Sequence, residues 1–413
     1  MHTYSGITPQ EYYDAIRAGN PIHFEMYFSD QGVTITEENI NISYGVTITD
    51  IINGDNELSV GKAVCQQFQA RIILNDDLRY IKWKDRFRVR FGVEINGDTA
   101  WITVGYYNGV KPKNVQTATE IDYVAYDDVI KYETHVDEFL DTLAYPIDTF
   151  DLGRAIGSYF DVTLSDVPSN TGTGFDWVTG TTFSKKQLSR YKTIREMLSA
   201  IAEATCTYIK MHTSYGTICN FEWFGDEQYN YGQPGYNDFP IIRRTDQFLN
   251  DHADLYNGLT WNELELRKWN AIQSQPWDNW DGNYRFTNKI DSFRLVNDEF
   301  AENSIYYARL PGYNNYYRIY SVEENLFTKN CFRSPNDYAT AYVTKLGDFG
   351  GQLPMVVECT GNWCIEAGDY VDVELEQGEV VHMPVYMHTL HYNGGITSTL
   401  ETTGESFGRY QNN

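Results

Sequence analysis

Short segments in which apolar and polar residues alternate, separated by tight turns, constrain the fold of this 413-residue chain most strongly. The clearest example lies near the C-terminus, where Val371, Val373 and Leu375 alternate with acidic residues. This period of two is expected of a strand with one buried face, and it recurs over residues 381–387 and 396–401. The pattern predicts a three-stranded antiparallel meander that closes a domain.

Turn residues delimit the strands of this terminal meander, which we assign to residues 361–404. Gly368 and Asp369 stand directly before the first strand, where glycine tolerates a positive φ and aspartate hydrogen-bonds its own backbone. Pro384 cannot donate to a strand ladder, so we expect its strand to lie at an edge or to carry a bulge. The Asn-Gly-Gly sequence at 393–395 supplies a tight hairpin turn.

The first 125 residues show the same alternation. A short helix comes first, capped by Thr8 and ended by Gly19. Asn-Gly-Asp sequences at 53–55 and 96–98 mark turns between the strands that follow. Many short strands at such spacing predict a first β-barrel or sandwich over residues 1–125. The strands are expected at 22–28, 33–42, 46–51, 65–74, 86–93, 99–107 and 121–126.

Residues 126–225 switch to helical patterns and predict an α+β domain. A strand is expected at 129–133 and a helix at 148–160. A clearer helix follows, where Thr193 and Glu196 form a capping box. The apolar face of that helix comprises Ile194, Met197, Leu198, Ile201 and Ala204. A hairpin formed by 207–211 and 217–223 completes the domain.

Residues 226–413 are assigned to a second β domain. Tyrosine and tryptophan crowd its first part, 226–285, which is either a surface excursion with a binding face or a loop-rich packing layer. Further along we expect strands at 290–295, 304–310 and 316–322, and a helix at 337–346. The predicted fold class is α+β, mainly β, with two β-barrel-like domains and an inserted helix-containing α+β domain.

Composition excludes some classes of function. The net charge is −25, from 32 basic and 57 acidic residues, which argues against nucleic-acid binding because phosphates need cationic partners. A negative charge of this size can keep the protein soluble. It can also keep DNA that passes the surface from binding to it. The six cysteines lack CxxC spacing and are interpreted as reduced. Neither a signal peptide nor a transmembrane span is recognisable, so we expect folding in a cytosol.

No catalytic signature stands out in the sequence. The eight histidines are scattered, and HExxH, GxSxG and phosphate-binding loops are absent from the sequence. Lone histidines on strands are expected at surfaces or interfaces. A glycosidase needs two carboxylates, and Asp137 with Asp141, or Asp278 with Asp281, could form such a pair. We interpret these residues instead as solvent-exposed surface charges. We therefore assign no catalytic residue and no cofactor.

The aromatic segment contains two candidate binding sites. Residues 278–283 carry oxygen ligands and a turn glycine, but they lack the register and terminal glutamate of a calcium-binding EF-hand loop, so no metal is assigned. Trp261, Trp277 and Trp280 are candidates for stacking on sugar rings. The alternative function is therefore a carbohydrate-binding (receptor-binding) tail protein or a glycan depolymerase.

Four segments, taken in order, give the chain a recognisable organisation. The first runs from Asn41 to Ala63 and includes the step Ser59-Val60-Gly61-Lys62, in which Gly61 is a structural turn. The others are 123–128, the helix at 193–204, and 363–369 with its Glu-Ala-Gly-Asp turn. In this order and spacing the chain resembles the baseplate hub proteins of tailed bacteriophages, also known as the amino-terminal domains of tail-associated lysins.

The resemblance implies a homotrimer whose paired barrel domains form a pseudo-sixfold ring. Such a ring would join the hexameric tail tube to the threefold tip and would gate the passage of DNA. It would bind tail-tube proteins and tip or fibre proteins, without a membrane anchor. Phage DNA would cross the lumen without specific binding, repelled by an acidic wall. Localisation would be the virion tail tip. Because the chain ends soon after the last predicted strand, we expect any lytic or fibre module to be a separate protein.

Overall fold

The computed structural model places most of the chain. It describes residues 7, 9–52, 60–113, 115, 117–165, 181–212, 216–222, 241–242, 292–296, 305–310, 319–329, 334–349, 356–363, 365–374 and 380–401. Apart from 241–242, the aromatic segment 226–285 lies outside the described residues, and so do Trp261, Trp277 and Trp280.

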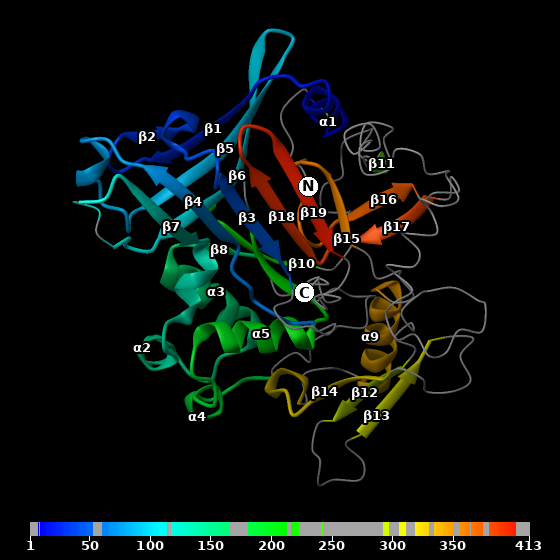
Figure 1. The fold of residues 1–413 in the computed structure, drawn as a ribbon. Coiled ribbons are helices and arrows are strands. Elements are labelled where there is room, and N and C mark those ends of the chain that lie inside the picture. The colour runs from blue at the N-terminus through cyan, green and yellow to red at the C-terminus, as the bar shows by residue number, and fades with distance from the viewer. Residues whose placement is uncertain are drawn as a thin grey trace, which may run out of the picture.

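A ten-stranded antiparallel sheet dominates the structure, in the order β15-β19-β18-β3-β4-β7-β6-β5-β1-β2. Seven strands come from the N-terminal region: β1 Ile22–Phe28, β2 Val33–Thr36, β3 Val46–Ile51, β4 Gln67–Ile73, β5 Arg86–Ile95, β6 Asp98–Gly109 and β7 Glu120–Tyr126. Three come from the other end: β15 Val356–Thr360, β18 Met387–Tyr392 and β19 Ile396–Glu401. Figure 1 shows the red strands β18 and β19 beside the blue β3.

The inner face of this sheet forms an aromatic core. Alternate residues of each strand point inward, so that Phe24 and Phe91 pack with ring centroids 5.5 Å apart. Helix α1, Pro9–Arg17, packs on this core through Tyr12. The rings of Tyr12 and Trp363 form a T-shaped pair with their centroids 5.9 Å apart. Asn96 and Gly97, both with positive φ, form the two-residue turn between β5 and β6.

The middle of the chain forms an α+β unit beside the sheet. It contains the 3-10 helix η3 Asp128–Glu133, the helices α2 Val136–Asp141, α3 Thr149–Phe160, α4 Lys185–Leu188 and α5 Ile194–Ala204, and the strands β8 Thr163–Leu164, β9 Tyr208–Met211 and β10 Ile218–Glu222. The three strands form a small sheet in the order β8-β10-β9. In Figure 1 the helices lie below the large sheet.

The predicted strand at 129–133 is wrong, because these residues form η3. The backbone N–H of Val129 donates to Asp127 Oδ1 at 3.1 Å, a local cap that favours a helical turn over an extended strand. Val129 and Tyr132 are nonetheless buried.

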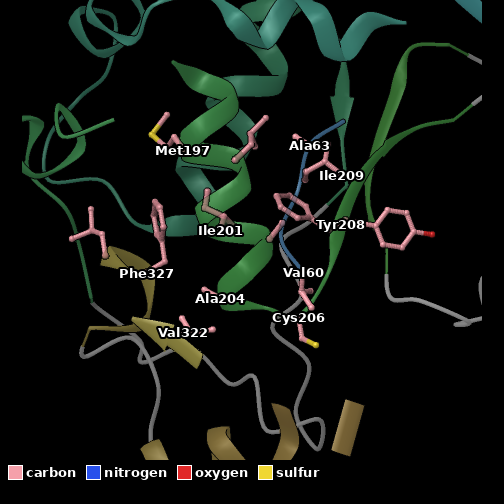
Figure 2. Close-up of a cluster of buried hydrophobic side chains, with 14 of the residues drawn as sticks. Val60, Ala63, Met197, Ile201, Ala204, Cys206, Tyr208, Ile209, Val322 and Phe327 are labelled. Atoms are coloured by element: carbon pink, nitrogen blue, oxygen red, sulfur yellow. The ribbon is translucent and has the colours of Figure 1, made fainter. Parts of the chain in front are cut away.

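Helix α5 is the centre of the second core (Figure 2), and its predicted apolar face is confirmed. Thr193 Oγ1 accepts the N–H of Glu196 at 3.1 Å, as expected of an N-cap. The Glu196 carboxylate accepts from the N–H of Lys192 at 2.7 Å, one residue before the cap. Two tyrosines of α9, Pro335–Phe349, close the other end of α5: Tyr338 Oη donates to Ala204 O at 2.9 Å and Tyr342 Oη to Glu203 O at 2.7 Å.

Helix α9 also covers a separate three-stranded sheet. Its strands are β12 Ser292–Val296, β13 Ile305–Arg309 and β14 Ile319–Glu323, in the order β13-β12-β14, followed by η6 Leu326–Thr328. Phe293 of β12 stacks on Tyr342 with centroids 4.2 Å apart. The predicted strands and helix of this region are confirmed.

The prediction of one terminal meander is wrong. β16 Tyr370–Glu374 and β17 Val380–Pro384 pair in a small sheet with β11 Ile241–Ile242, whereas β18 and β19 belong to the large sheet. The chain changes sheets at Pro384, which cannot donate to a ladder. Directly after it, the N–H of Val385 donates to Asp369 O at 2.8 Å and that of Tyr386 to Glu401 O at 2.8 Å.

The fold class predicted from sequence, α+β and mainly β, is confirmed. The domain boundaries at 125/126 and 225/226 stay predictions, and β15, β18 and β19 share the sheet of the first 125 residues. Within the described residues, no helix has the length and apolar character needed to cross a membrane.

Candidate functional site: a buried charged junction

Three distant segments of the chain meet at the end of β3 through one buried lysine. Lys210 Nζ, on β9, donates to Asp50 Oδ2 at 3.0 Å and to Ala367 O at 2.8 Å. The N–H of Ala367 donates to the same Asp50 oxygen at 2.9 Å. The three groups thus form a closed ring of hydrogen bonds between the large sheet, the α+β unit and the segment before β16.

The strands themselves place these charges inside the protein. Asp50 shares the inward side of β3 with Val46 and Ile48, and Lys210 lies between the buried Ile209 and Met211. Isolated buried charges are strongly unfavourable, so each must be paired. Burial alone would lower the pKa of Lys210, but the surrounding carboxylates, led by Asp50, outweigh it and hold this pKa above its usual value.

The Gly368-Asp369 turn presents Ala367 to this pair. Gly368 has a φ of +101°, and a side chain there would overlap the Tyr208 hydroxyl. Its N–H donates to Val385 O at 2.7 Å. Asp369 Oδ2 accepts the N–H of Glu366 at 2.9 Å, which closes the turn. The backbone geometry of this turn therefore fixes both hydrogen bonds of Ala367.

Tyr208 connects the turn to a further carboxyl, that of the half-buried Glu222. Its hydroxyl donates to Glu222 Oε2 at 3.2 Å, and Asn220 Nδ2 donates to Oε1 at 3.1 Å. Burial raises the pKa of Glu222, while Lys210 and the Asn220 hydrogen bond partly oppose this rise. The Glu222 carboxylate thus accepts hydrogen bonds from side chains of both β9 and β10.

The exit of β7 supplies two more acidic residues. Asp128 is 3% exposed and binds Arg86 Nη2 at 3.1 Å, Lys131 Nζ at 3.0 Å and Asn108 Nδ2 at 2.6 Å. Asp127 caps η3, and burial raises its pKa to about 8. A small hollow between the sheet and the α+β unit is lined by Asp50, Gln66, Asp127, Asp128, Lys210 and His212.

Gly61 lies where the first motif segment meets α5. Its φ is +86°, and a side chain there would overlap the backbone of Glu203. The N–H of Gly61 donates to Thr207 O at 2.8 Å, and the N–H of Ile209 donates to Lys62 O at 3.1 Å. This step therefore ties residues 60–63 to the end of α5 and the start of β9.

A serine–histidine pair in the large sheet has the spacing of a nucleophile and a base, yet it is structural. Ser398 Oγ lies 2.7 Å from His388 Nε2, and His388 Nδ1 donates to Ile365 O at 2.9 Å. Ser398 Oγ also accepts the N–H of Asn362 at 3.1 Å. Both side chains are buried, so a substrate cannot reach the hydroxyl. The expected surface position of a strand histidine is wrong for His388.

The remaining sequence candidates do not form a site in the described residues. Asp137 and Asp141 are exposed on α2 and pair with His135 and Lys185, respectively. Residues 278–283 lie outside the described part of the chain. Where the structure describes the chain, no three histidine, cysteine, aspartate or glutamate side chains converge on a metal-binding position.

Comparisons with known proteins found 18 similar solved chains, among them the following three. No protein-family model and no curated protein matches the chain. A tail protein from Neisseria meningitidis MC58 is 9% identical, with a TM-score of 0.48 over 93% of this chain and 96% of that one. A 43 kDa tail protein of prophage MuSo2 from Shewanella oneidensis is 12% identical, with a TM-score of 0.46 over 93% and 98%. Prophage tail protein gp18 from Listeria monocytogenes EGD-e is 8% identical, with a TM-score of 0.44 over 94% and 96%.

Proposed function

We propose that this chain is a structural hub of the tail tip of a tailed bacteriophage. Three copies would form a ring that joins the tail tube to the tip and surrounds the path of the DNA. The observation that carries the proposal is the convergence of three motif segments on the buried charged junction, with the fourth, the helix at 193–204, packed on the Gly61 step of the first. These are the segments on which the resemblance to baseplate hub proteins rests.

Three of the segments reach the junction directly, and the fourth reaches it through the first. The first supplies Asp50 and the Gly61 step, and the helix at 193–204 receives that step at Glu203. The exit at 123–128 supplies Asp127 to the hollow, and the last segment supplies Ala367 to Asp50. Asp50 and Ala367 are separated by 317 positions in sequence. Their contact therefore joins motif segments that lie far apart along the chain.

The junction suits a mechanical role. Removing one partner of a buried ion pair typically destabilises a protein by about 3–5 kcal/mol, so such pairs hold the joined elements in one arrangement. A ring subunit must transmit load between a tube and a tip without changing shape. Lys210, Asp50 and Ala367 would provide that rigidity.

The acidic composition fits passage of DNA. A net charge of −25 per chain repels phosphates, so a lumen with this character would let DNA slide without binding. We propose that the lumen wall of the ring is acidic on balance.

Light scattering coupled to size-exclusion chromatography tests the proposed function on the full chain. The expected mass is three times the chain mass of 47.7 kDa, with no affinity for glycans. A monomer that binds glycans would favour the carbohydrate-binding alternative. A monomer that cleaves cell-wall polymers would contradict the hub.

A further inference from the structure

A histidine of the large sheet lies between two carboxylates. His23 of β1 has its Nδ1 atom 3.1 Å from Glu37 Oε1 and its Nε2 atom 3.3 Å from Glu94 Oε1. Both ring nitrogens therefore face an acceptor. A protonated imidazole can donate a hydrogen bond from both nitrogens, whereas a neutral imidazole can donate from only one. Both hydrogen bonds can thus form at the same time only when the ring is protonated.

The two carboxylates belong to different elements. Glu37 is the first residue of the 3-10 helix η1, Glu37–Asn39, which directly follows β2, and Glu94 lies on β5. Glu37 also accepts the N–H of Phe24 through Oε2 at 3.3 Å. In the described part of the chain, β2 is the last strand of the large sheet and pairs with β1. His23 therefore connects η1 and the end of this edge strand to β1 and β5.

The other groups on the same side of β1 leave these two contacts in control of the ring. Glu25 of β1 and Arg90 of β5 point to the side of His23, because side chains alternate along a strand. Arg90 Nη2 binds Glu25 Oε2 at 2.6 Å, so these two charges pair with each other. The neighbouring residues Thr36 of β2 and Trp101 of β6 are uncharged, and the Trp101 ring centroid lies 6.2 Å from that of His23.

These contacts favour the protonated form of the ring. The hydrogen bond to Glu37 raises the pKa of His23, partial burial opposes this rise, and Glu94 adds to it, so that the pKa lies above its ordinary value of 6.5. Burial alone would raise the pKa of Glu37, but its hydrogen bonds with backbone N–H groups and with His23 hold this pKa below its ordinary value. The His23 side chain is 31% exposed, so its ring can exchange protons with water.

We propose that His23 is a pH-dependent clamp, which holds η1 and β2 against β1 and β5 while its ring is protonated and loosens this edge of the sheet when the ring gives a proton to water. A neutral ring leaves one of the two carboxylates opposite a nitrogen lone pair, which repels it. The clamp belongs to the single subunit and does not depend on the proposed ring of three chains.

The sign of the pH dependence follows from the pKa of His23. This pKa is higher in the folded protein than the value of 6.5 expected in the unfolded chain. The stabilisation is therefore fully present below that value and is lost as the pH rises through the folded pKa. Acidic conditions close the clamp, and alkaline conditions open it.

NMR titration of the histidine Cε1–Hε1 signals in the full-length chain tests the clamp. The His23 signal is assigned by its loss in His23→Gln. We expect the His23 pKa to lie above 6.5 and to fall both in Glu37→Gln and in Glu94→Gln. The matched control is Glu38→Gln, which makes the same change at an exposed position of η1 and should leave the His23 pKa nearly unchanged. A His23 pKa at or below 6.5, or one that neither substitution lowers, would overturn the proposal.

Hydrogen exchange followed by mass spectrometry tests the loosening itself. Unmodified protein and His23→Gln are compared at the same pH, which cancels the pH dependence that both proteins share. At about pH 5.5 the amides of residues 33–40 should exchange roughly threefold faster in the variant, the size expected for partly exposed ion pairs. At about pH 9 this ratio should approach one, because the unmodified ring is then neutral. A ratio that is the same at both pH values would contradict a clamp that responds to pH.

Discussion

Asp127 places an ionisable side chain where water is largely excluded. Its pKa of about 8 lies above the ordinary value of 3.8 because burial disfavours the charged form. The folded protein therefore keeps a proton that the unfolded chain releases at about pH 4. Since the unfolded state binds fewer protons between these values, the contribution of Asp127 to stability falls as the pH rises from about 4 to about 8.

Asp127→Asn should remove this pH dependence. An amide keeps an oxygen that can accept the N–H of Val129, and it has no proton to lose. One unit of pKa corresponds to about 1.4 kcal/mol, so we expect the variant to gain a few kcal/mol relative to the unmodified protein between pH 5 and pH 8. Urea unfolding at both pH values measures this gain, and parallel curves for the two proteins would contradict it.

Gly368→Ala should destabilise the turn before β16 through two separate effects. The first is the positive φ, and the second is overlap of the new Cβ with the Tyr208 hydroxyl. Gly97 has a φ of +91° with no atom within 4 Å of its Cβ position, so Gly97→Ala reports the first effect alone, about 1 kcal/mol. We expect Gly368→Ala to cost at least about 2 kcal/mol more in the free energy of unfolding. Equal losses would show that Tyr208 does not constrain the turn.

At the scale of elements, the end of α5 depends on hydrogen bonds from α9. The last carbonyls of a helix lack partners within the helix, and here Tyr338 and Tyr342 satisfy two of them. Replacing both tyrosines by phenylalanine keeps the rings and removes only the hydroxyl groups. We expect a loss of about 2–4 kcal/mol, since Ala204 O loses the Tyr338 hydroxyl and Glu203 O is left with the N–H of Cys206 at 3.2 Å.

Thermal unfolding followed by calorimetry measures this loss. The matched control is Tyr80→Phe, where the side chain is 78% exposed and the loss of a hydroxyl should change stability by less than about 0.5 kcal/mol. If the double variant melts as the control does, α9 does not stabilise α5 through these bonds.

Local patterns determined most of the elements. The strands β1 to β7 follow the predicted alternation, with 33–42 ending earlier as β2, and α5 follows its capping residue and apolar face. Prediction from sequence failed where a local cap or a tertiary partner determined the secondary structure or the sheet pairing. Asp127 turned 129–133 into η3, helix α2 was not predicted, and the chain left one sheet for another at Pro384.

The junction could be predicted only in part. Gly61, Gly368 and Asp369 were recognisable as turn residues, because positive φ and local hydrogen bonding are properties of single residues. The pairing of Lys210 with Asp50 spans 160 positions, and local patterns carry no information about such partners. The available signal was chemical: Asp50 stands at an inward position of its strand, and Lys210 is flanked by apolar residues.

At the scale of the whole molecule, the two ends of the chain complete one sheet. β3 pairs with β18, and the junction ties the segment before β16 to both β3 and β9. The large sheet therefore forms only after residues separated by more than 300 positions have met. This closure gives the subunit a single frame that joins both ends of the chain.

Electron microscopy of the purified full-length chain tests the central claim most directly. The account predicts ring-shaped particles with threefold symmetry and an open centre. Single copies without a ring, at concentrations where the protein is otherwise folded, would contradict it.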